Sequence, residues 1–328
     1  MTVSERSRAF SMLKHDGASA LTSPHLLGLN GIPRGDIEKI FETATSFKEV
    51  LERPIKRVPS LQGITVVNLF FESSTRTRTS FELAEKRLSA DVVNFSASVS
   101  SLSKGETLKD TARNIEAMKV DIVVIRHPAA GAPHFLARVL HAHVINAGDG
   151  AHEHPTQALL DMFTLKEKFG SLENLHVGIV GDIAHSRVAL SNIYGLTLMG
   201  AKVSVCGPPT MIPREIESLG VDVYYHIDEL IPRVQALNVL RIQLERDAGA
   251  RIPSLREYRT YFGITRERLE RASQPITILH PGPINRDVEL SAEIADSEHS
   301  LILDQVLNGV AIRMAVLYLL SLSHPGAL

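Results

Sequence analysis

Short apolar runs rich in Val and Ile alternate with amphipathic segments along most of the chain, and this alternation constrains the fold more than any other feature. Nine runs are predicted as strands: Ile64–Phe71, Asp91–Phe95, Asp121–Arg126, His143–Ala147, His176–Gly181, Lys202–Cys206, Val221–His226, Ala236–Ile242 and Pro275–His280. Helical patterns lie between them, among them Leu108–Met118, Pro155–Phe169, Arg187–Met199 and Asp304–Leu320. Such alternation is typical of parallel strands with helices on both faces, so we predict an α/β fold.

The length of 328 residues favours two domains over one. The division is expected where the segment KFGSLENL (168–175) ends a long helical pattern and precedes a new series of strands and helices. We therefore expect two doubly wound parallel-sheet domains, residues 1–168 and 169–303, with a cleft between them. The last helical segment, 304–322, is apolar nearly all round and is expected to be buried, packing back on the first domain.

Composition and charge exclude several classes of partner. A net charge of −2 gives no basic surface for nucleic acid. The single Cys206 leaves no internal disulfide and no cysteine zinc cluster, which fits a reducing compartment. The start MTVSERSRAF lacks the apolar core of a signal peptide, and the apolar stretch Met314–Leu322 is far shorter than the ~20 residues of a membrane span. We expect a cytoplasmic protein with neither a nucleic-acid nor a membrane partner.

A cluster of hydroxyls and guanidiniums follows the first predicted strand. The segment ESSTRTR (72–78) comes next, and then Phe81, Ala84 and Leu88 recur as on one face of a helix. Free backbone N–H groups and the positive end of the helix dipole favour an anion at such a start, and arginine adds bidentate donors for phosphate. An ordinary N-cap with exposed arginines is the alternative, but one Ser or Thr suffices for a cap. We predict an anion site here.

Several other strand ends also carry arginine or a rigid turn. Arg126-His127-Pro128 follows one strand, Arg241-Ile242-Gln243 ends another, and His280-Pro281-Gly282-Pro283 follows the last. Arg187 opens a helical segment, where a plain surface arginine is an equally good interpretation. In open α/β sheets the ligand lies beyond the carboxyl ends of the strands. Together with Arg76, these arginines predict a site for a multiply anionic set of ligands.

The loop GDGAHEHPTQ (148–157) places His152, Glu153 and His154 before a helix that begins at Pro155. A metal site is one interpretation, but the loop lacks cysteine, the helical i, i+4 spacing of a zinc pair and an evident acidic partner. A neutral His154 that donates a hydrogen bond, with Gln157 one helical turn along, is the preferred interpretation.

Other sites for catalysis or cofactors do not fit the chain. Gly178 and Gly181 suggest a dinucleotide turn, but the GxGxxG spacing fails at Ile183 and Ser186, which disfavours a nicotinamide cofactor. No Ser-His-Asp pattern, Walker loop or close carboxylate pair is evident. A site of cations and hydroxyls acts by positioning two reactants and stabilising developing charge. A non-catalytic protein that senses an anionic metabolite is the alternative from another class.

The motifs SSTRTRTSFELA, SKGETLKDT, RHP, DGAHEHPTQALLD, GDIAHSR, RIQLER and HPGP, in this order, resemble those of the aspartate/ornithine carbamoyltransferase family, over about Gly31 to Leu320. Within the family, the aspartate-specific catalytic chains are the better match. Ornithine or another amino acid is the alternative, but ornithine enzymes carry an HCLP motif where this chain has HPGP. Arg187, Arg241 and Lys104 also suit the two carboxylates of aspartate better than the ammonium of ornithine.

The resemblance implies roles in binding carbamoyl phosphate. Its phosphate would be held by the start of the helix, through Ser74, Thr75, Arg76 and Thr77. Its carbonyl oxygen would contact Thr77, Arg126 and His154. Its NH2 group would be oriented by Gln157 and by the backbone at Gly282 and Pro283.

The resemblance also implies the second substrate and the assembly. L-aspartate would be bound by Arg187, Arg241 and Gln243. Lys104 resembles a lysine that enters the site from the neighbouring subunit of a homotrimer, with Ser100 or Ser101 as the companion serine. The product would be N-carbamoyl-L-aspartate, made in the committed step of pyrimidine synthesis, without cofactor, metal or covalent enzyme intermediate. In this family the trimers occur alone, with regulatory chains or with a dihydroorotase-like partner, and no segment here selects among these.

Overall fold

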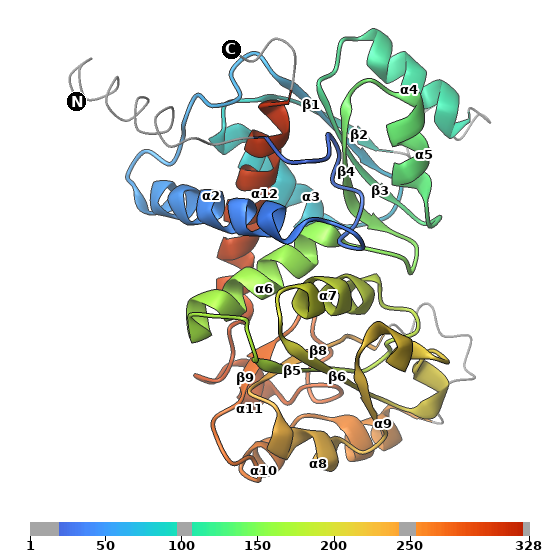
Figure 1. Ribbon diagram of the computed structural model, residues 1–328, viewed down its shortest axis with the longest axis vertical. Helices are drawn as coiled ribbons and strands as arrows, with labels where there is room; N and C mark the ends of the chain where they lie inside the picture. The colour runs from blue at the N-terminus through green and yellow to red at the C-terminus, as the bar shows by residue number, and fades with distance from the viewer. Residues whose placement is uncertain (1–19, 97–106, 243–253, 324–328) are drawn as a thin grey trace.

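The structure, a computed structural model, describes residues 20–96, 107–242 and 254–323 (Figure 1). Two parallel sheets form the centres of two α/β domains. The first sheet has the order β2-β1-β3-β4 and the second the order β7-β6-β5-β8-β9. The strands are β1 Thr65–Phe70, β2 Asp91–Ser96, β3 Ile122–His127, β4 His143–Asp149, β5 His176–Val180, β6 Lys202–Cys206, β7 Asp222–Tyr224, β8 Ala236–Val239 and β9 Thr277–Leu279. The predicted fold of two parallel-sheet domains is confirmed, and each predicted strand contains or overlaps one of these.

Helices cover the sheets and connect the two domains. They are α2 Arg34–Glu52, α3 Thr75–Arg87, α4 Leu108–Ala117, α5 Ala132–Val139, α6 Pro155–Phe169, α7 Arg187–Leu198, α8 Ile227–Leu230, α9 Leu255–Phe262, α10 Arg266–Leu269, α11 Ala292–Ala295 and α12 Ile302–Ser321, with short 3-10 turns at Pro209–Met211, Ile216–Leu219 and Ile231–Arg233. The helix α6 lies between the upper and lower halves of Figure 1, where the chain passes from one domain to the other. A domain boundary at residues 168 and 169 remains a prediction.

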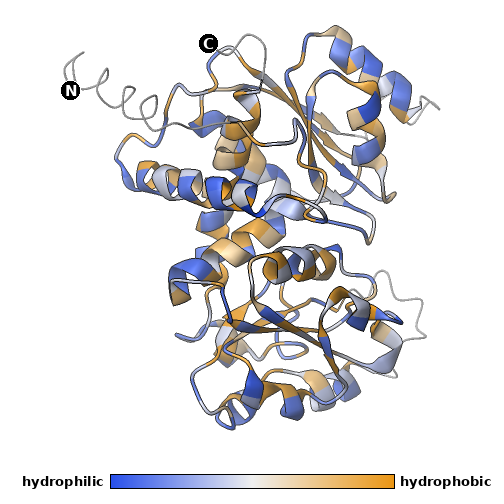
Figure 2. Ribbon diagram, viewed as in Figure 1, coloured by the Kyte–Doolittle hydropathy of each residue, from blue (hydrophilic) through white to orange (hydrophobic). Residues whose placement is uncertain are grey.

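The final helix α12 packs against α2, α3 and α6, so the predicted return of the C-terminal helix to the first domain is confirmed. Figure 2 shows α2 with alternating hydrophilic and hydrophobic residues, whereas α12 is mostly hydrophobic. The helix α12 is long and apolar enough to span a membrane, although the apolar stretch noted in the sequence is shorter. Of the most apolar 18 residues of this helix, 67% are buried inside the protein, as expected of a core helix.

Strand register brings the loops of the predicted site together. In the first sheet, Phe70 at the end of β1 lies beside Arg126 of β3. In the second, Val180 of β5 lies beside Val239 of β8, and Asn238 lies beside Leu279 of β9. Because the strands are parallel, the segments that follow them all leave the sheet at the same edge.

A buried carboxyl group in the first domain makes stability depend on pH. Glu85 of α3 is fully buried, and its Oε2 accepts a hydrogen bond from Nδ2 of Asn68 at 2.8 Å. Burial raises the pKa of Glu85 to about 8. In the unfolded chain the group ionises near its ordinary pKa, so the folded state loses stability as the pH rises through the interval between the two values and the loss is complete above about pH 8.

We therefore expect Glu85→Gln to remove this loss. The advantage of the variant over the wild type should grow by up to about 1.4 kcal/mol per pH unit between about pH 5 and pH 8. Denaturant unfolding at pH 6 and pH 8.5 measures the difference. An equal pH dependence in both proteins would show that Glu85 is ionised in the folded state.

Candidate active site

A cleft of about 1140 Å³ lies between the two domains, at the ends of both sheets. It is lined by every predicted site residue that the structure describes: Ser74, Thr75, Arg76, Thr77, Arg126, His154, Gln157, Arg187, Arg241, Gly282 and Pro283. Four predicted residues, Lys104, Gln243 and the alternatives Ser100 and Ser101, lie outside the described residues. The geometry thus joins residues from widely separated parts of the chain in one space.

The start of α3 forms one wall of the cleft. Ser74 occupies the N-cap position, but its side chain makes no capping hydrogen bond. The first backbone N–H groups of a helix have no partner within it, so those after Ser74 remain available to a ligand. The Arg76 side chain lies against Gly282, where an added Cβ would come 3.1 Å from Cζ of Arg76. Gly282 has a φ of +67° and leaves space for the guanidinium, so the β9 loop and the start of α3 meet here.

The cleft has a strong excess of positive charge. Burial and the positive charge of Arg241 both lower the pKa of Arg76, so these guanidiniums from different domains repel each other. Arg286 also lines the cleft but pairs with Asp296. Of the lining residues in the described ranges, only Glu72 carries a carboxylate. A ligand with anionic groups at two positions would relieve the repulsion.

Glu72 joins two arginines from opposite domains, a role that the sequence analysis did not predict. Its Oε2 accepts hydrogen bonds from Nε of Arg126 at 3.1 Å and from Nη2 of Arg187 at 2.9 Å. Arg126 also donates to the carbonyl oxygen of Ala147. The interpretation of Arg187 as a plain surface residue is wrong, since only 6% of it is exposed and it packs against Gly148. In the sequence Glu72 directly follows the apolar run Ile64–Phe71, and this position could have indicated that Glu72 belongs to the site.

His154 is a buried, neutral imidazole at the start of α6. Burial lowers its pKa well below the ordinary value, and the charges of Arg126, Arg187 and Arg313 lower it further. Its backbone N–H donates to Oγ of Ser191 at 2.9 Å, which fixes the residue at the N-cap position of the helix. A neutral imidazole surrounded by guanidiniums can donate a hydrogen bond to an oxygen without adding another full charge to the site.

Arg313 is a further cation in the cleft that the sequence analysis missed. It lies on α12, donates to Oγ of Ser80 at 3.1 Å, and its guanidinium sits 5.0 Å from the centre of the Phe81 ring. Burial lowers its pKa to about 10. A lone arginine within an apolar helix was the signal in the sequence, since charge in such a place needs a specific partner.

The metal interpretation of the loop before α6 fails on geometry, because the three side chains separate. Glu153 accepts hydrogen bonds from the backbone N–H of Leu29 at 2.7 Å and of Asn30 at 3.2 Å, which secures the N-terminal segment. His154 lines the cleft, whereas His152 lies away from it and pairs with Asp149 at 3.1 Å. Asp149 is the acidic partner that was not evident in the sequence.

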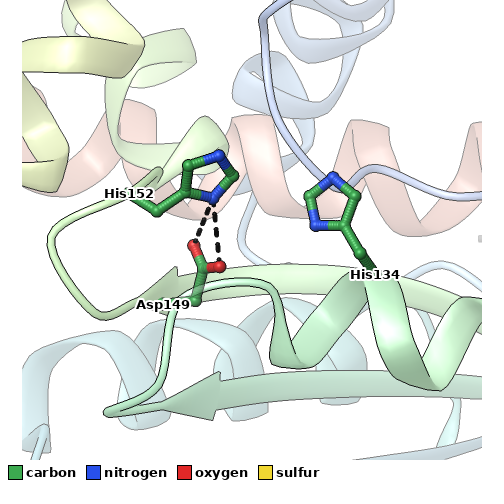
Figure 3. A group of neighbouring side chains, drawn as sticks. All are labelled: His134, Asp149 and His152. Atoms are coloured by element: carbon green, nitrogen blue, oxygen red, sulfur yellow. Dashed lines mark hydrogen bonds and ion pairs between the residues drawn. The ribbon is translucent and has the colours of Figure 1, made fainter.

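His134 joins His152 and Asp149 in a second arrangement that could hold a metal, with ligand atoms within 4.8 Å of one another (Figure 3). The carboxylate of Asp149 already has structural partners. It accepts hydrogen bonds from the N–H of Gly131 at 2.7 Å and from Nδ2 of Asn146 at 2.9 Å. These contacts tie the start of α5 to the end of β4, so Asp149 has a structural role that needs no metal.

Comparisons with known proteins match both halves of the chain. The family model of the carbamoyl-phosphate-binding domain of aspartate/ornithine carbamoyltransferases matches residues 24–167, and that of the Asp/Orn-binding domain matches residues 173–320. The aspartate carbamoyltransferase catalytic subunit of Cytophaga hutchinsonii is 59% identical over 303 residues, which cover 92% of this chain and 99% of that protein.

Solved structures of aspartate transcarbamoylase from Trypanosoma cruzi have the same fold at 30% identity. The complex with carbamoyl phosphate and aspartate has a TM-score of 0.81 and covers 92% of this chain and 97% of that one. The complex with N-(phosphonacetyl)-L-aspartic acid also has a TM-score of 0.81, with 92% and 96% covered.

Proposed function

The chain belongs to the aspartate/ornithine carbamoyltransferase family, and from this premise we infer that it is an aspartate carbamoyltransferase catalytic chain. It transfers the carbamoyl group of carbamoyl phosphate to the amino group of L-aspartate and releases phosphate. The product, N-carbamoyl-L-aspartate, serves pyrimidine synthesis. The main support for this conclusion is the composition of the cleft. Arginines from both domains line it, and Glu72 is the one acidic residue among the lining residues that the structure describes.

The charges in the cleft favour aspartate over ornithine. The ammonium group of ornithine would need an acidic partner, and Glu72 already accepts hydrogen bonds from two guanidiniums. The two carboxylates of aspartate are instead matched by Arg187 and Arg241, with Gln243 as a further proposed contact. Bidentate guanidinium–carboxylate contacts fix both the position and the orientation of the substrate.

Carbamoyl phosphate binds against the wall of the cleft that the start of α3 forms. The backbone N–H groups and side chains of Ser74, Thr75, Arg76 and Thr77 hold the phosphate. Arg126, His154 and Thr77 donate to the carbonyl oxygen. Gln157 and the backbone at Gly282 and Pro283 accept hydrogen bonds from the carbamoyl NH2.

The reaction follows from this placement. The amine of aspartate attacks the carbamoyl carbon, and the carbonyl oxygen gains negative charge as the tetrahedral intermediate forms. Arg126 and neutral His154 stabilise that charge more strongly than they bind the uncharged carbonyl. The C–O bond to phosphate then breaks, and the departing phosphate accepts the proton lost by the amine. The enzyme contributes positioning and electrostatics, and no covalent enzyme intermediate forms.

A cytoplasmic homotrimer is the assembly we propose, in which Lys104 enters the site of a neighbouring subunit. The support is the likeness of its motif to the family. Regulatory chains or a dihydroorotase-like protein are further partners consistent with this family.

Incubation with carbamoyl phosphate and L-aspartate tests the proposed function. We expect N-carbamoyl-L-aspartate and phosphate in equal amounts, and no citrulline when L-ornithine replaces aspartate. Turnover with ornithine and not with aspartate would reverse the assignment within the family, and phosphate binding without turnover would favour a sensing protein.

A further inference from the structure

Asp161 is a buried carboxylate on α6 that does not itself line the cleft. It accepts four hydrogen bonds, and every donor is a side-chain amide. Oδ1 accepts from Nε2 of Gln157 at 2.9 Å and from Nε2 of Gln305 at 2.7 Å. Oδ2 accepts from Nδ2 of Asn192 at 2.8 Å and from Nδ2 of Asn238 at 3.0 Å. The donors come from α6, α12, α7 and β8, so elements of both domains meet at this residue.

An ionised carboxylate can only accept hydrogen bonds, and that property fixes the direction of the amides around it. A primary amide carries two donors at one end and an acceptor at the other, and it can be turned either way. Next to Asp161, each NH2 end must face the carboxylate, so each amide oxygen must face elsewhere. Burial opposes ionisation and raises the pKa of Asp161 to about 6, while the four amides favour the charged form.

Two of these amides, those of Gln157 and Gln305, connect Asp161 to the groups proposed to bind the carbamoyl NH2. Gln157 lines the cleft, and with its NH2 on Asp161 its oxygen is left to accept a hydrogen bond from substrate. Oε1 of Gln305 accepts from the backbone N–H of His280 at 2.9 Å. Nδ1 of His280 in turn accepts from the N–H of Gly282 at 2.8 Å. A single carboxylate oxygen therefore positions both the Gln157 oxygen and the Gly282–Pro283 backbone.

We propose that Asp161 is a positioning residue that sets selectivity for the NH2 group of carbamoyl phosphate, by directing the oxygen of Gln157 and, through Gln305 and His280, the backbone of the Gly282–Pro283 turn. The proposal rests on the proposed function of the cleft. Acetyl phosphate is the appropriate probe, because it has the same phosphate and carbonyl groups but a methyl group in place of the NH2.

The test compares the two acyl phosphates in Asp161→Leu, which has a similar shape and accepts no hydrogen bond. The KM for carbamoyl phosphate and the inhibition constant of acetyl phosphate are measured in the same aspartate assay. We expect the KM for carbamoyl phosphate to rise about 10-fold or more, as for the loss of one or two neutral hydrogen bonds, while the inhibition constant of acetyl phosphate stays within about twofold. Asp161→Asn retains one acceptor oxygen and should recover part of the selectivity.

Asn238→Leu is the matched control, because it removes a donor from the other oxygen of Asp161 and leaves Gln157 and Gln305 in place. It should weaken the fold without changing the ratio of the two constants. Should Asp161→Leu fail to fold, Gln305→Met removes the hydrogen bonds to Asp161 and His280 but leaves Gln157 on Asp161, and it should still shift the ratio in the same direction.

An equal rise of both constants in Asp161→Leu, or an unchanged ratio in both Asp161→Leu and Gln305→Met, would overturn the proposal. Failure of the proposed function itself would appear separately, as a wild-type protein that forms no carbamoyl-aspartate.

Discussion

The kcat of the Arg126→Ala variant is expected to fall by a factor of about 10² to 10³, while its KM for aspartate changes little. Arg126 is the last residue but one of β3, and its guanidinium is held in place by Glu72 and by the carbonyl oxygen of Ala147. Its proposed contact with the carbonyl oxygen strengthens as negative charge develops there. The contact therefore contributes more to the transition state than to the bound substrates.

Steady-state kinetics with both substrates varied would measure this loss. Arg138→Ala provides the matched control, because Arg138 is an exposed arginine at the end of α5 and does not line the cleft. It should retain wild-type constants. A near-normal kcat for Arg126→Ala would remove this residue from the chemistry.

The second large effect concerns sharing of the site between subunits. If Arg76 serves the site of its own subunit and Lys104 serves that of its neighbour, homotrimers of Arg76→Ala and of Lys104→Ala should each be nearly inactive. When the two proteins are dissociated, mixed in equal amounts and reassembled, about three in four trimers contain both kinds of subunit. In a closed ring of three, each mixed trimer has one junction where an intact Arg76 meets an intact Lys104.

About one site in three is then complete in every mixed trimer, so the pool should regain about a quarter of the wild-type activity, with wild-type KM values. Native mass spectrometry confirms that mixed trimers have formed. Recovery near zero in their presence would mean that each site is built from a single chain.

The positions of the strands could be predicted from the sequence because buried parallel strands are short, continuous apolar runs. Thr65–Phe70 and Lys202–Cys206 match their predicted ranges closely. The strands β7 and β8 were predicted to be longer than they are. A strand ends where its hydrogen-bond pairing with a neighbour ends, and hydrophobicity does not show that point. The order of strands in each sheet could not be predicted, since it depends on which crossover each helix makes.

The cleft residues could be predicted where polar groups follow an apolar strand, as at Arg126 and Arg241. The groups that hold them in place could not. Asn192, Asn238 and Gln305 look like ordinary polar residues in the sequence, and only the tertiary fold brings their amides to one carboxylate. The acidic partner of His152 is Asp149, three residues before it at the end of β4, and it was overlooked because the sequence does not show which way the two side chains point.

Titration with N-(phosphonacetyl)-L-aspartate tests most directly the claim that one cleft binds both substrates across the two domains. The compound joins a phosphonate to aspartate through an acetyl group, so it offers anions to both walls at once. We predict one binding site per chain by calorimetry, with affinity reduced about 10- to 100-fold by Arg76→Ala and by Arg241→Ala, as for the loss of a charge-assisted hydrogen bond at either end. Wild-type affinity in either variant would contradict the account, because one end of the compound would then lie outside the cleft.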